Sequence, residues 1–234
     1  MLRDVSFSVG FGERVAVIGP NGAGKTSLIN VLSGLLPATS GEVHILGHEV
    51  TTLPQHSRVR LGLARSFQLN TLFSNMTLLE NVLLAVQGTR RSHLRMFKPI
   101  TAYAGLLAEA QKFLQEAGLW ERRDMPVSSL SYGEQRQVEM VLALSSRPKV
   151  LLLDEPSAGL SAAEISTLIN LTRRLPKETA VLFSAHDMDV VFALADRVMV
   201  LYYGQILAQG TPKEIQVDTK VREIYLGTEG AEIA

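Results

Sequence analysis

A stretch near the N-terminus has the residue types and spacing of a phosphate-binding loop. The segment Gly19-Pro20-Asn21-Gly22-Ala23-Gly24-Lys25-Thr26 fits the pattern G-x-x-x-x-G-K-[ST]. Its glycines let backbone N–H groups turn toward a phosphate without a Cβ in the way, and a following helix adds partial positive charge at its N-terminus. Lys25 can then reach the β- and γ-phosphates, and the Thr26 hydroxyl can bind Mg²⁺. The alternative is a chance match, which is expected roughly once in a hundred chains of this length.

Two carboxylates follow an apolar run in the second half of the chain. Val150–Leu153 is typical of a strand buried on both faces of a parallel sheet, and Asp154 and Glu155 come directly after it. Ligands of open α/β sheets bind at this end of the strands, where carboxylates are costly unless they are paired or bind a metal. We expect Asp154 to coordinate Mg²⁺ and Glu155 to activate water. A capping pair for the next helix is the weaker alternative, because Pro156 and Ser157–Leu160 intervene.

Two further segments place polar groups where an anion could bind. His186 follows another buried-strand pattern, Thr179–Ser184, so we expect it at the same end of the sheet as Asp154. Ser131 and Gly133 precede a helical pattern, which places them at a helix N-terminus with exposed N–H groups. The alternatives are a structural histidine and an ordinary N-cap.

The elements that must position these residues alternate between strands and helices. Arg14–Ile18 indicates a buried strand before the glycine loop, and Ser27–Ser33 indicates a helix after it. Residues 69–148 have a mainly helical pattern, which includes a capping box at Thr77. The other predicted strands are Val5–Val9, Glu42–Leu46, Leu63–Gln68 and a hairpin over Val198–Ala208. The other predicted helices are Thr52–Leu61, Thr101–Gly118, one capped by Ser161, one capped by Thr211, and Val221–Leu226.

Composition excludes several classes of protein. The 234 residues include 23 Lys+Arg and 23 Asp+Glu, so the formal net charge is zero and bulk electrostatic binding to nucleic acid is not indicated. The absence of cysteine excludes a disulfide scaffold and a thiolate metal site. No apolar stretch approaches about 18 residues and the N-terminus lacks a signal pattern, so we expect neither a membrane span nor a secretory leader. The basic stretch Arg90–Lys98 is either a solvated loop or a contact with a partner or anionic lipid.

Taken together, these segments resemble the ATP-binding subunits of ABC transporters along nearly the whole chain. The glycine loop is similar to the Walker A motif, Gln68 to the Q-loop glutamine and Leu130–Gln135 to the signature motif. Val150–Glu155 is similar to the Walker B motif with its catalytic glutamate. Ser157–Leu160 is similar to the D-loop, and His186 to the switch histidine.

The resemblance implies an α/β fold, with a P-loop ATPase core built on a mostly parallel sheet with flanking antiparallel strands, plus an inserted helical subdomain. A single ABC ATPase domain then spans residues 1–234. Its core comprises residues 1–68 and 149–210, the helical subdomain residues 69–148, and a C-terminal helical tail residues 211–234.

The resemblance also implies ATP and Mg²⁺ as the cofactors and a role for each motif in ATP hydrolysis. Lys25 is implied to hold the phosphates, Glu155 to orient the attacking water, and His186 to contact the γ-phosphate. The implied ligands of Mg²⁺ are Thr26, Gln68 and Asp154. The implied nucleotide-binding positions are Asn21, Gly22, Ala23, Gly24, Lys25, Thr26, Ser27, Gln68, Ser131, Gly133 and Glu134.

The partners of such a subunit follow from the same resemblance. Ser131 and Gly133 are implied to close on ATP bound by a second ATP-binding subunit, identical or paralogous, in a head-to-tail dimer. Transmembrane permease subunits and, indirectly, a periplasmic solute-binding protein complete the implied assembly, and no nucleic acid takes part. The implied location is cytoplasmic, peripheral on the inner face of the cell membrane.

Finer details resemble the ATPases of branched-chain amino-acid importers, which implies import of those amino acids or of a related polar solute. The segments concerned are Phe67–Gln68, Leu72–Thr77, Ser131–Gly133, His186–Met188 and Glu223–Gly227. Urea- or amide-import and lipopolysaccharide-export ATPases are close alternatives. A soluble ABC ATPase of DNA repair or translation is the alternative from another class. Those proteins commonly carry two ATPase cores or a long coiled coil, whereas this chain has a single glycine loop.

The sequence departs from the family pattern at the position that holds adenine. The family usually has an aromatic residue upstream of the strand that here begins near Val5, and this chain starts after that position. Phe7 fits the core alternation, and Phe11 lies in the turn beside the glycine loop. We therefore expect weak nucleotide affinity, with a loss of about 1–3 kcal/mol, and poor discrimination of ATP from GTP. Glu134 and Ala185 also differ from the residues common in relatives, without removing an implied role.

Overall fold

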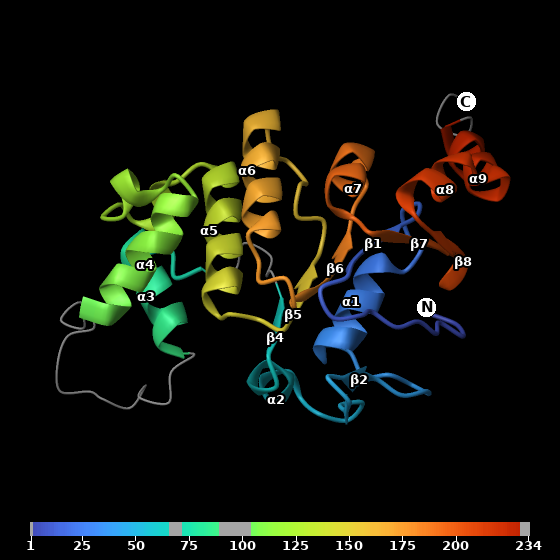
Figure 1. Ribbon diagram of the computed structural model, residues 1–234, viewed down its shortest axis with the longest axis horizontal. Helices are drawn as coiled ribbons and strands as arrows, with labels where there is room; N and C mark the ends of the chain where they lie inside the picture. The colour runs from blue at the N-terminus through green and yellow to red at the C-terminus, as the bar shows by residue number, and fades with distance from the viewer. Residues whose placement is uncertain (1, 66–71, 89–103, 230–234) are drawn as a thin grey trace. The chain divides into compact units, whose positions relative to one another are not determined.

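The computed structural model describes residues 2–65, 72–88 and 104–229, with the side chains of residues 225–229 left undescribed. The chain forms two compact units, each assembled from segments that are separate in sequence (Figure 1). The first comprises Met1–Leu63, Lys149–Pro156 and Pro176–Ala234, and the second comprises Ala64–Pro148 and Ser157–Leu175. The predicted domain division stays a prediction, and α6 (Ala162–Arg173) groups with the second unit.

The centre of the first unit is formed by five strands of a six-stranded sheet with strand order β4-β5-β6-β1-β7-β8, and β4 begins at Leu63, the last residue of that unit's first segment. The pairs β5–β6, β6–β1 and β1–β7 are parallel, and β7–β8 is an antiparallel hairpin. The sequence prediction of a mostly parallel sheet with an antiparallel flank is therefore confirmed. The strands are β1 (Arg14–Ile18), β4 (Leu63–Arg65), β5 (Val150–Leu153), β6 (Ala180–Ser184), β7 (Arg197–Tyr202) and β8 (Gln205–Gly210).

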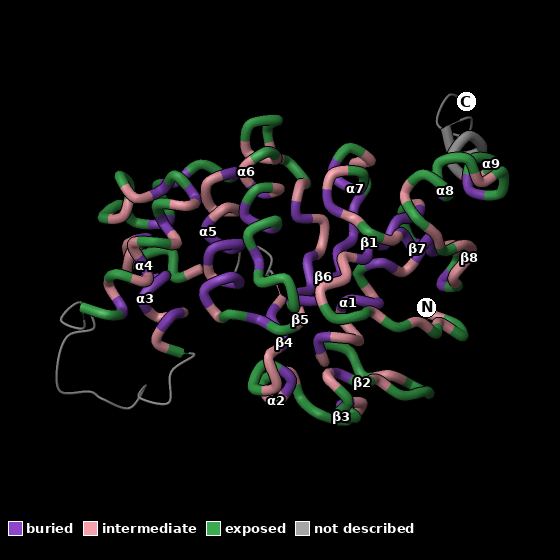
Figure 2. The backbone as a smooth tube through the Cα atoms, in the orientation of Figure 1, coloured by how far each residue is buried: buried purple, intermediate pink, exposed green. Residues whose placement is uncertain are grey.

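The strand residues form these elements because they are apolar on both faces of the sheet. Every residue of β6 is buried, as are the last three of β5 and the last four of β1, which is the pattern of a sheet covered on both sides (Figure 2). In Figure 1 the strands lie between α1 (Lys25–Ser33) on one side and α7 (Met188–Leu194) on the other. Burial of these apolar side chains holds the strands in place. Polar groups can therefore follow at the carboxyl ends of the strands without lowering the stability of the fold.

Short elements complete the first unit. The hairpin of β2 and β3 follows α1, and α2 leads into β4. Both α8 and α9 follow β8 at the C-terminal end of the described chain. Their bounds are β2 (His44–Ile45), β3 (His48–Glu49), α2 (Gln55–Arg60), α8 (Pro212–Val217) and α9 (Thr219–Glu229).

The second unit is helical among its described residues beyond the end of β4. In it α3 packs on α4 and α5, and α5 packs on α6. Buried apolar residues at helical spacing, such as Leu78, Val82 and Val86, form its core. Its helices are α3 (Leu78–Gly88), α4 (Ala104–Glu116), α5 (Tyr132–Ser145), α6, and two short 3₁₀ helices, η3 (Trp120–Arg122) and η4 (Val127–Ser129).

Predicted helix starts agree with the structure where a capping residue marks them. The side chains of Ser131, Ser161 and Thr211 each accept a hydrogen bond from the backbone N–H three residues later. The glutamate at that later position accepts a hydrogen bond from the backbone N–H of the capping residue. Thr77 and Glu80 form the same reciprocal pair at α3. These capping boxes are local, so the sequence alone specifies them.

The predicted strand at Val5–Val9 is wrong. The alternation of half-buried and exposed side chains is present, and Val5, Phe7 and Val9 pack against the core, but the segment forms no ladder with the described strands. A groove of about 1380 Å³ lies among this segment, α1 and the β2–β3 hairpin. A strand requires a neighbouring strand for its backbone hydrogen bonds, so the alternation of half-buried and exposed side chains does not by itself identify a strand.

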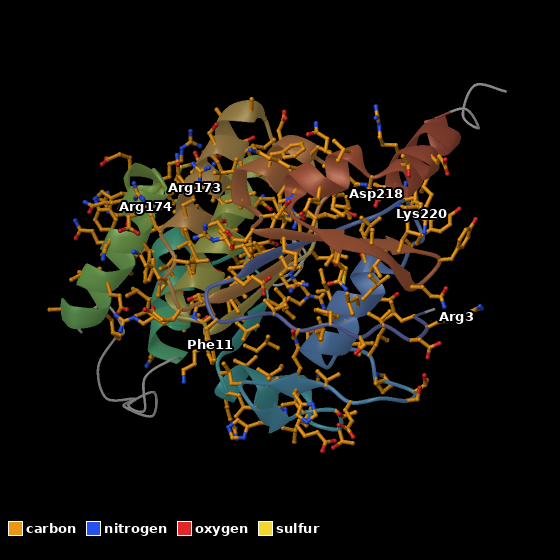
Figure 3. The ribbon with its side chains drawn as sticks, turned by 45° about the vertical axis from the view of Figure 1, so that its right-hand side comes forward. Arg3, Phe11, Arg173, Arg174, Asp218 and Lys220 are labelled. Atoms are coloured by element: carbon orange, nitrogen blue, oxygen red, sulfur yellow. The ribbon has the colours of Figure 1, made fainter. Side chains whose placement is uncertain are left out.

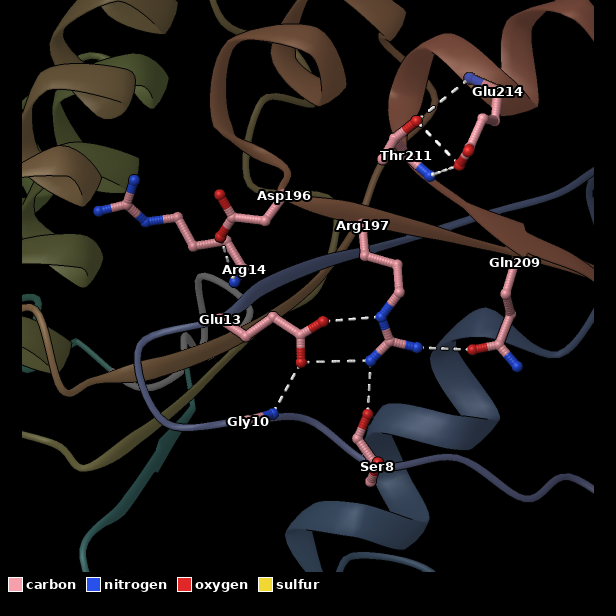
Figure 4. A network of polar contacts seen from close by, with 9 residues as sticks. All are labelled: Ser8, Gly10, Glu13, Arg14, Asp196, Arg197, Gln209, Thr211 and Glu214. Atoms are coloured by element: carbon pink, nitrogen blue, oxygen red, sulfur yellow. Dashed lines mark hydrogen bonds and ion pairs between the residues drawn. The ribbon is translucent and has the colours of Figure 1, made fainter.

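The amino ends of the strands are held together by a polar network (Figure 4). Glu13 accepts from Arg197 Nε at 2.7 Å and Nη2 at 3.2 Å, and from the Gly10 N–H at 2.7 Å. Arg197 also donates to Gln209 Oε1 at 2.6 Å and to the Ser8 carbonyl at 2.5 Å. One guanidinium thereby joins the N-terminal segment, β7 and β8.

Candidate functional site

The glycine loop connects the carboxyl end of β1 to the start of α1. Gly22 and Gly24 have φ values of 77° and 108°, which favour glycine over other residues. A Cβ added at Gly19 would overlap the Leu201 carbonyl oxygen of the neighbouring strand. The loop therefore needs glycine both for its backbone conformation and for its close approach to β7.

Lys25 lies inside this loop. Its ammonium donates to the Gly19 carbonyl at 2.8 Å and to the Pro20 carbonyl at 3.2 Å, and the residue is only 5% exposed. Burial lowers the pKa of Lys25, although the charges of Glu155 and Asp154 act to raise it. A cavity of about 240 Å³ opens beside the ammonium and is lined by Asn21, Gly22, Ala23, Gly24, Lys25, Thr26, Ser27 and Glu155.

The side chains of Thr26 and Asp154 converge at the edge of this cavity. Thr26 Oγ1 lies 3.3 Å from Asp154 Oδ1, and the same carboxylate oxygen accepts from Ser184 Oγ at 2.8 Å. A hydroxyl and a carboxylate that meet beside a phosphate cradle fit Mg²⁺, which is usually bound by one or two carboxylates together with substrate phosphates and water. Among the residues that the structure describes there is no cluster of three His, Cys, Asp or Glu side chains that could hold a metal ion.

Glu155 and His186 form an accessible pair next to Asp154. Glu155 Oε1 lies 2.9 Å from His186 Nε2, and the two side chains are 38% and 46% exposed. The backbone of Glu155 has a φ of 47°, a left-handed conformation that is uncommon for a residue other than glycine. The parallel strands bring this pair together, because β5 and β6 run side by side and both end here. A water molecule could reach the carboxylate from solvent.

The sequence-predicted nucleotide residues fall into three groups in the structure. The glycine-loop residues, Asp154, Glu155 and His186 belong to the first unit and meet at the carboxyl end of its sheet. Ser131, Gly133 and Glu134 belong to the second unit, at the start of α5. Gln68 and the basic stretch Arg90–Lys98 lie outside the described residues.

The start of α5 is closely packed within its own unit. A Cβ at Gly133 would overlap the Glu164 carboxyl group, and Tyr132 lies against Gly159. Ser131 Oγ accepts the Glu134 N–H at 3.3 Å, and the Glu134 carboxylate accepts from the Ser131 N–H at 2.9 Å and from Arg122 at 2.6 Å. Glu134 thus acts here as a helix cap, while the first N–H groups of the helix have no intrahelical acceptors.

Phe11 is far from the glycine loop. Gly12 in the same turn donates to the Glu178 carbonyl, which places Phe11 at the amino end of β1, whereas the glycine loop follows the carboxyl end. The five residues of β1 between them span about 16 Å. Phe11 is 76% exposed, whereas Phe7 packs against the core. Figure 3 labels Phe11. The structure thus corrects the expected place of Phe11 beside the loop.

Sequence reasoning missed one polar residue at the centre of this site. Ser184 is fully buried, and its hydroxyl lies between Asp154 and the backbone of Glu155. The sequence pattern indicates Ser184 only as the last residue of an apolar strand. A signal was available, since a hydroxyl at the end of a buried strand beside a carboxylate requires a hydrogen-bond partner.

The geometry defines an α/β protein that binds nucleotide phosphates, and comparison with known proteins specifies the family. The ABC transporter family matches residues 2–158, and the branched-chain amino acid ATP-binding cassette transporter family matches residues 205–231. The chain belongs to the ABC transporter family of ATP-binding cassettes, which hydrolyse ATP. Cassettes of this family work with transmembrane permease subunits.

Individual relatives agree with this assignment over nearly the full chain. The high-affinity branched-chain amino acid transport ATP-binding protein BraF of Pseudomonas aeruginosa is 37% identical, covering 97% of this chain and 91% of the relative. The lipopolysaccharide export system ATP-binding protein LptB of Acidithiobacillus ferridurans is 34% identical, covering 97% and 90%. The crystal structure of MJ1267, an ATP-binding cassette of an ABC transporter in its ADP conformation, has a TM-score of 0.82 at 32% identity, covering 97% and 92%.

Within residues 2–65, 72–88 and 104–229, no helix has the length and apolar character that crossing a membrane requires.

Proposed function

We propose that this chain binds ATP with Mg²⁺ at the glycine loop and supplies the energy for import of branched-chain amino acids. The observation that carries the proposal is the cavity lined by Lys25, Thr26 and Glu155. Asp154 contacts Thr26 and His186 contacts Glu155 beside this cavity. Similarity to BraF and the match of residues 205–231 support the choice of solute.

Each of these side chains has a role in the proposed reaction. Lys25 and the loop N–H groups hold the phosphates, with Asn21 and Ser27 at the two edges of the cradle. Thr26, Asp154 and Gln68 hold Mg²⁺, which when bound neutralises charge on the phosphates. Glu155 orients the attacking water, and His186 contacts the γ-phosphate. Phosphoryl transfer needs positioning and charge stabilisation more than covalent help, and this arrangement can supply both.

The nucleotide site is proposed to be completed by a second ATP-binding subunit. Ser131, Gly133 and Glu134 at the start of α5 would close on ATP held by the partner in a head-to-tail dimer. A helix N-terminus suits this role, because its N–H groups and partial positive charge favour an anionic ligand. In this proposal the ATPase core is residues 1–68 and 149–210, and the helical subdomain is residues 69–148.

The proposed assembly includes permease subunits and, indirectly, a periplasmic solute-binding protein. The chain would then work on the cytoplasmic side of the membrane as a peripheral subunit. Lipopolysaccharide export is the second candidate, because LptB is nearly as similar to this chain as BraF is.

The experiment is deletion of the gene from its host, followed by measurement of radiolabelled leucine uptake. We expect uptake to be lost and to be restored by the wild-type chain but not by Glu155→Gln. Unchanged leucine uptake together with a defect in the outer membrane would reject import and support export. Absence of phosphate release from the purified chain, alone and with its permease, would reject the ATPase site itself.

A further inference from the structure

Ser184 occupies a position between the two carboxylate residues of the site. It is the last residue of β6, and the β5–β6 register pairs Leu153 with Phe183, so Ser184 comes beside Asp154. Its hydroxyl donates to Asp154 Oδ1 at 2.8 Å and accepts the Glu155 N–H at 2.9 Å. The residue is fully buried, so solvent does not compete for these bonds.

These two bonds act on different parts of the site. A serine hydroxyl has one proton to donate and lone pairs to accept, and here the proton is directed at the Asp154 carboxylate. A lone pair of the same oxygen accepts the Glu155 N–H. Glu155 has a φ of 47°, a left-handed backbone conformation that costs energy for a residue other than glycine. Thr26 Oγ1, from α1, lies 3.3 Å from the same Asp154 oxygen.

We propose that Ser184 is a positioning residue for the nucleotide-bound metal ion and for the water-activating carboxylate. By fixing Asp154 it orients the carboxylate that would hold Mg²⁺, and by fixing the Glu155 backbone it positions the Glu155 side chain, which lines the cavity. The inference rests on the proposed function, because it assumes Mg²⁺ and ATP at the glycine loop. Hydrogen bonds behind a metal ligand orient it, and removing them commonly weakens metal binding about 10- to 100-fold.

The test separates metal positioning from a role in packing alone. The protein is titrated with a fluorescent ATP analogue, once in the presence of EDTA and once in excess Mg²⁺. All variants carry Glu155→Gln so that turnover does not interfere with the measurement. The ratio of the two dissociation constants is the magnesium enhancement. Ser184→Ala removes the hydroxyl, while Ser184→Thr and Ser184→Val form a matched pair that differs only in the hydroxyl.

We expect Ser184→Ala and Ser184→Val to lose about tenfold of the magnesium enhancement, with less than about twofold change in EDTA. Ser184→Thr should keep most of the enhancement, and the comparison with Ser184→Val remains decisive if Ser184→Ala does not fold. If the magnesium enhancement is equal with Ser184 and with Ser184→Ala, or equal in Ser184→Thr and Ser184→Val, the proposed role of Ser184 is overturned while the proposed function stands. A wild-type chain that binds nucleotide without magnesium enhancement overturns the metal site and this role together.

Discussion

The two ends of the parallel strands carry similar charged groups and use them differently. At the amino end, Glu13 and Arg197 form a two-point ion pair, and both side chains are about one quarter exposed, at 25% and 26%. At the carboxyl end, Glu155 Oε1 lies 2.9 Å from His186 Nε2, and 38% of the Glu155 side chain is exposed. The first arrangement neutralises its charges within the unit, while the second leaves acceptor positions available for a ligand.

Backbone conformation differs between the two ends in residue type: at the amino end the positive φ of 73° belongs to a glycine, Gly12, whereas at the carboxyl end a glutamate, Glu155, has one. Glu155 has a left-handed backbone held from behind by Ser184, and the loop before Lys25 depends on glycines with positive φ. Costly conformations of this kind persist where surrounding structure holds them, and they concentrate at functional sites. We propose that the amino end serves stability and the carboxyl end serves chemistry. Substitutions that exchange the same chemical groups at the two ends can test this.

The largest expected effect is that of Glu155→Gln at the carboxyl end. Loss of the carboxylate removes the group proposed to activate water, so phosphate release should fall by about 100-fold or more, while ATP binding is retained. The matched control is Glu13→Gln, which makes the same chemical change at the amino end and should leave turnover within about twofold. Turnover near the wild-type rate in Glu155→Gln contradicts the assignment.

A somewhat smaller effect is expected for Lys25→Met, which removes the buried ammonium and keeps a side chain of similar length. A charged hydrogen bond to phosphate is worth about 1.5–3 kcal/mol, so nucleotide affinity should fall about 10- to 100-fold. Equilibrium titration with a fluorescent nucleotide measures the change, and Arg197→Met is the amino-end control. Equal losses of affinity in the two variants would show that the ends do not differ in this respect.

The amino-end ion pair should affect stability and leave the reaction unchanged. Because both partners are partly exposed, their coupling should be about 1 kcal/mol. A double-mutant cycle of Glu13→Gln and Arg197→Met, followed by urea unfolding, measures this coupling. A coupling indistinguishable from zero, or a changed KM for ATP in these variants, would remove the distinction between the ends.

The smallest expected effect is a pH dependence of that stabilisation. The hydrogen bonds from Arg197 hold the pKa of Glu13 below its ordinary value of 4.5, despite an opposing effect of burial. A carboxyl group with a lowered pKa in the folded state stabilises that state fully above the unfolded pKa, and loses this as the pH falls through the folded pKa. The difference in unfolding free energy between wild type and Glu13→Gln should be constant above about pH 5 and shrink below pH 4.5. A difference that grows on acidification contradicts this sign.

Elements with a local signal were predictable from the sequence. The glycine loop, the capping boxes at Ser131, Ser161 and Thr211, and the apolar strand before Asp154 all appear where the sequence places them. In contrast, α7 was not predicted: it has seven residues and, unlike the six-residue α8, no capping box marks its start, although Val190, Val191 and Leu194 are buried at helical spacing. Short helices carry too few periodic positions to be recognised with ease.

The sequence by itself determined where the glycine loop and the acidic pair lie, because these signals depend on neighbours within a few positions. Only the tertiary structure decided that Ser184 joins Asp154 to Glu155, since that contact spans 30 residues and requires β5 and β6 to be adjacent. It also decided that Val5–Val9 is not a strand and that Phe11 lies at the opposite end of β1 from the glycine loop. Pairing between distant segments is set by the whole core, and no local pattern contains it.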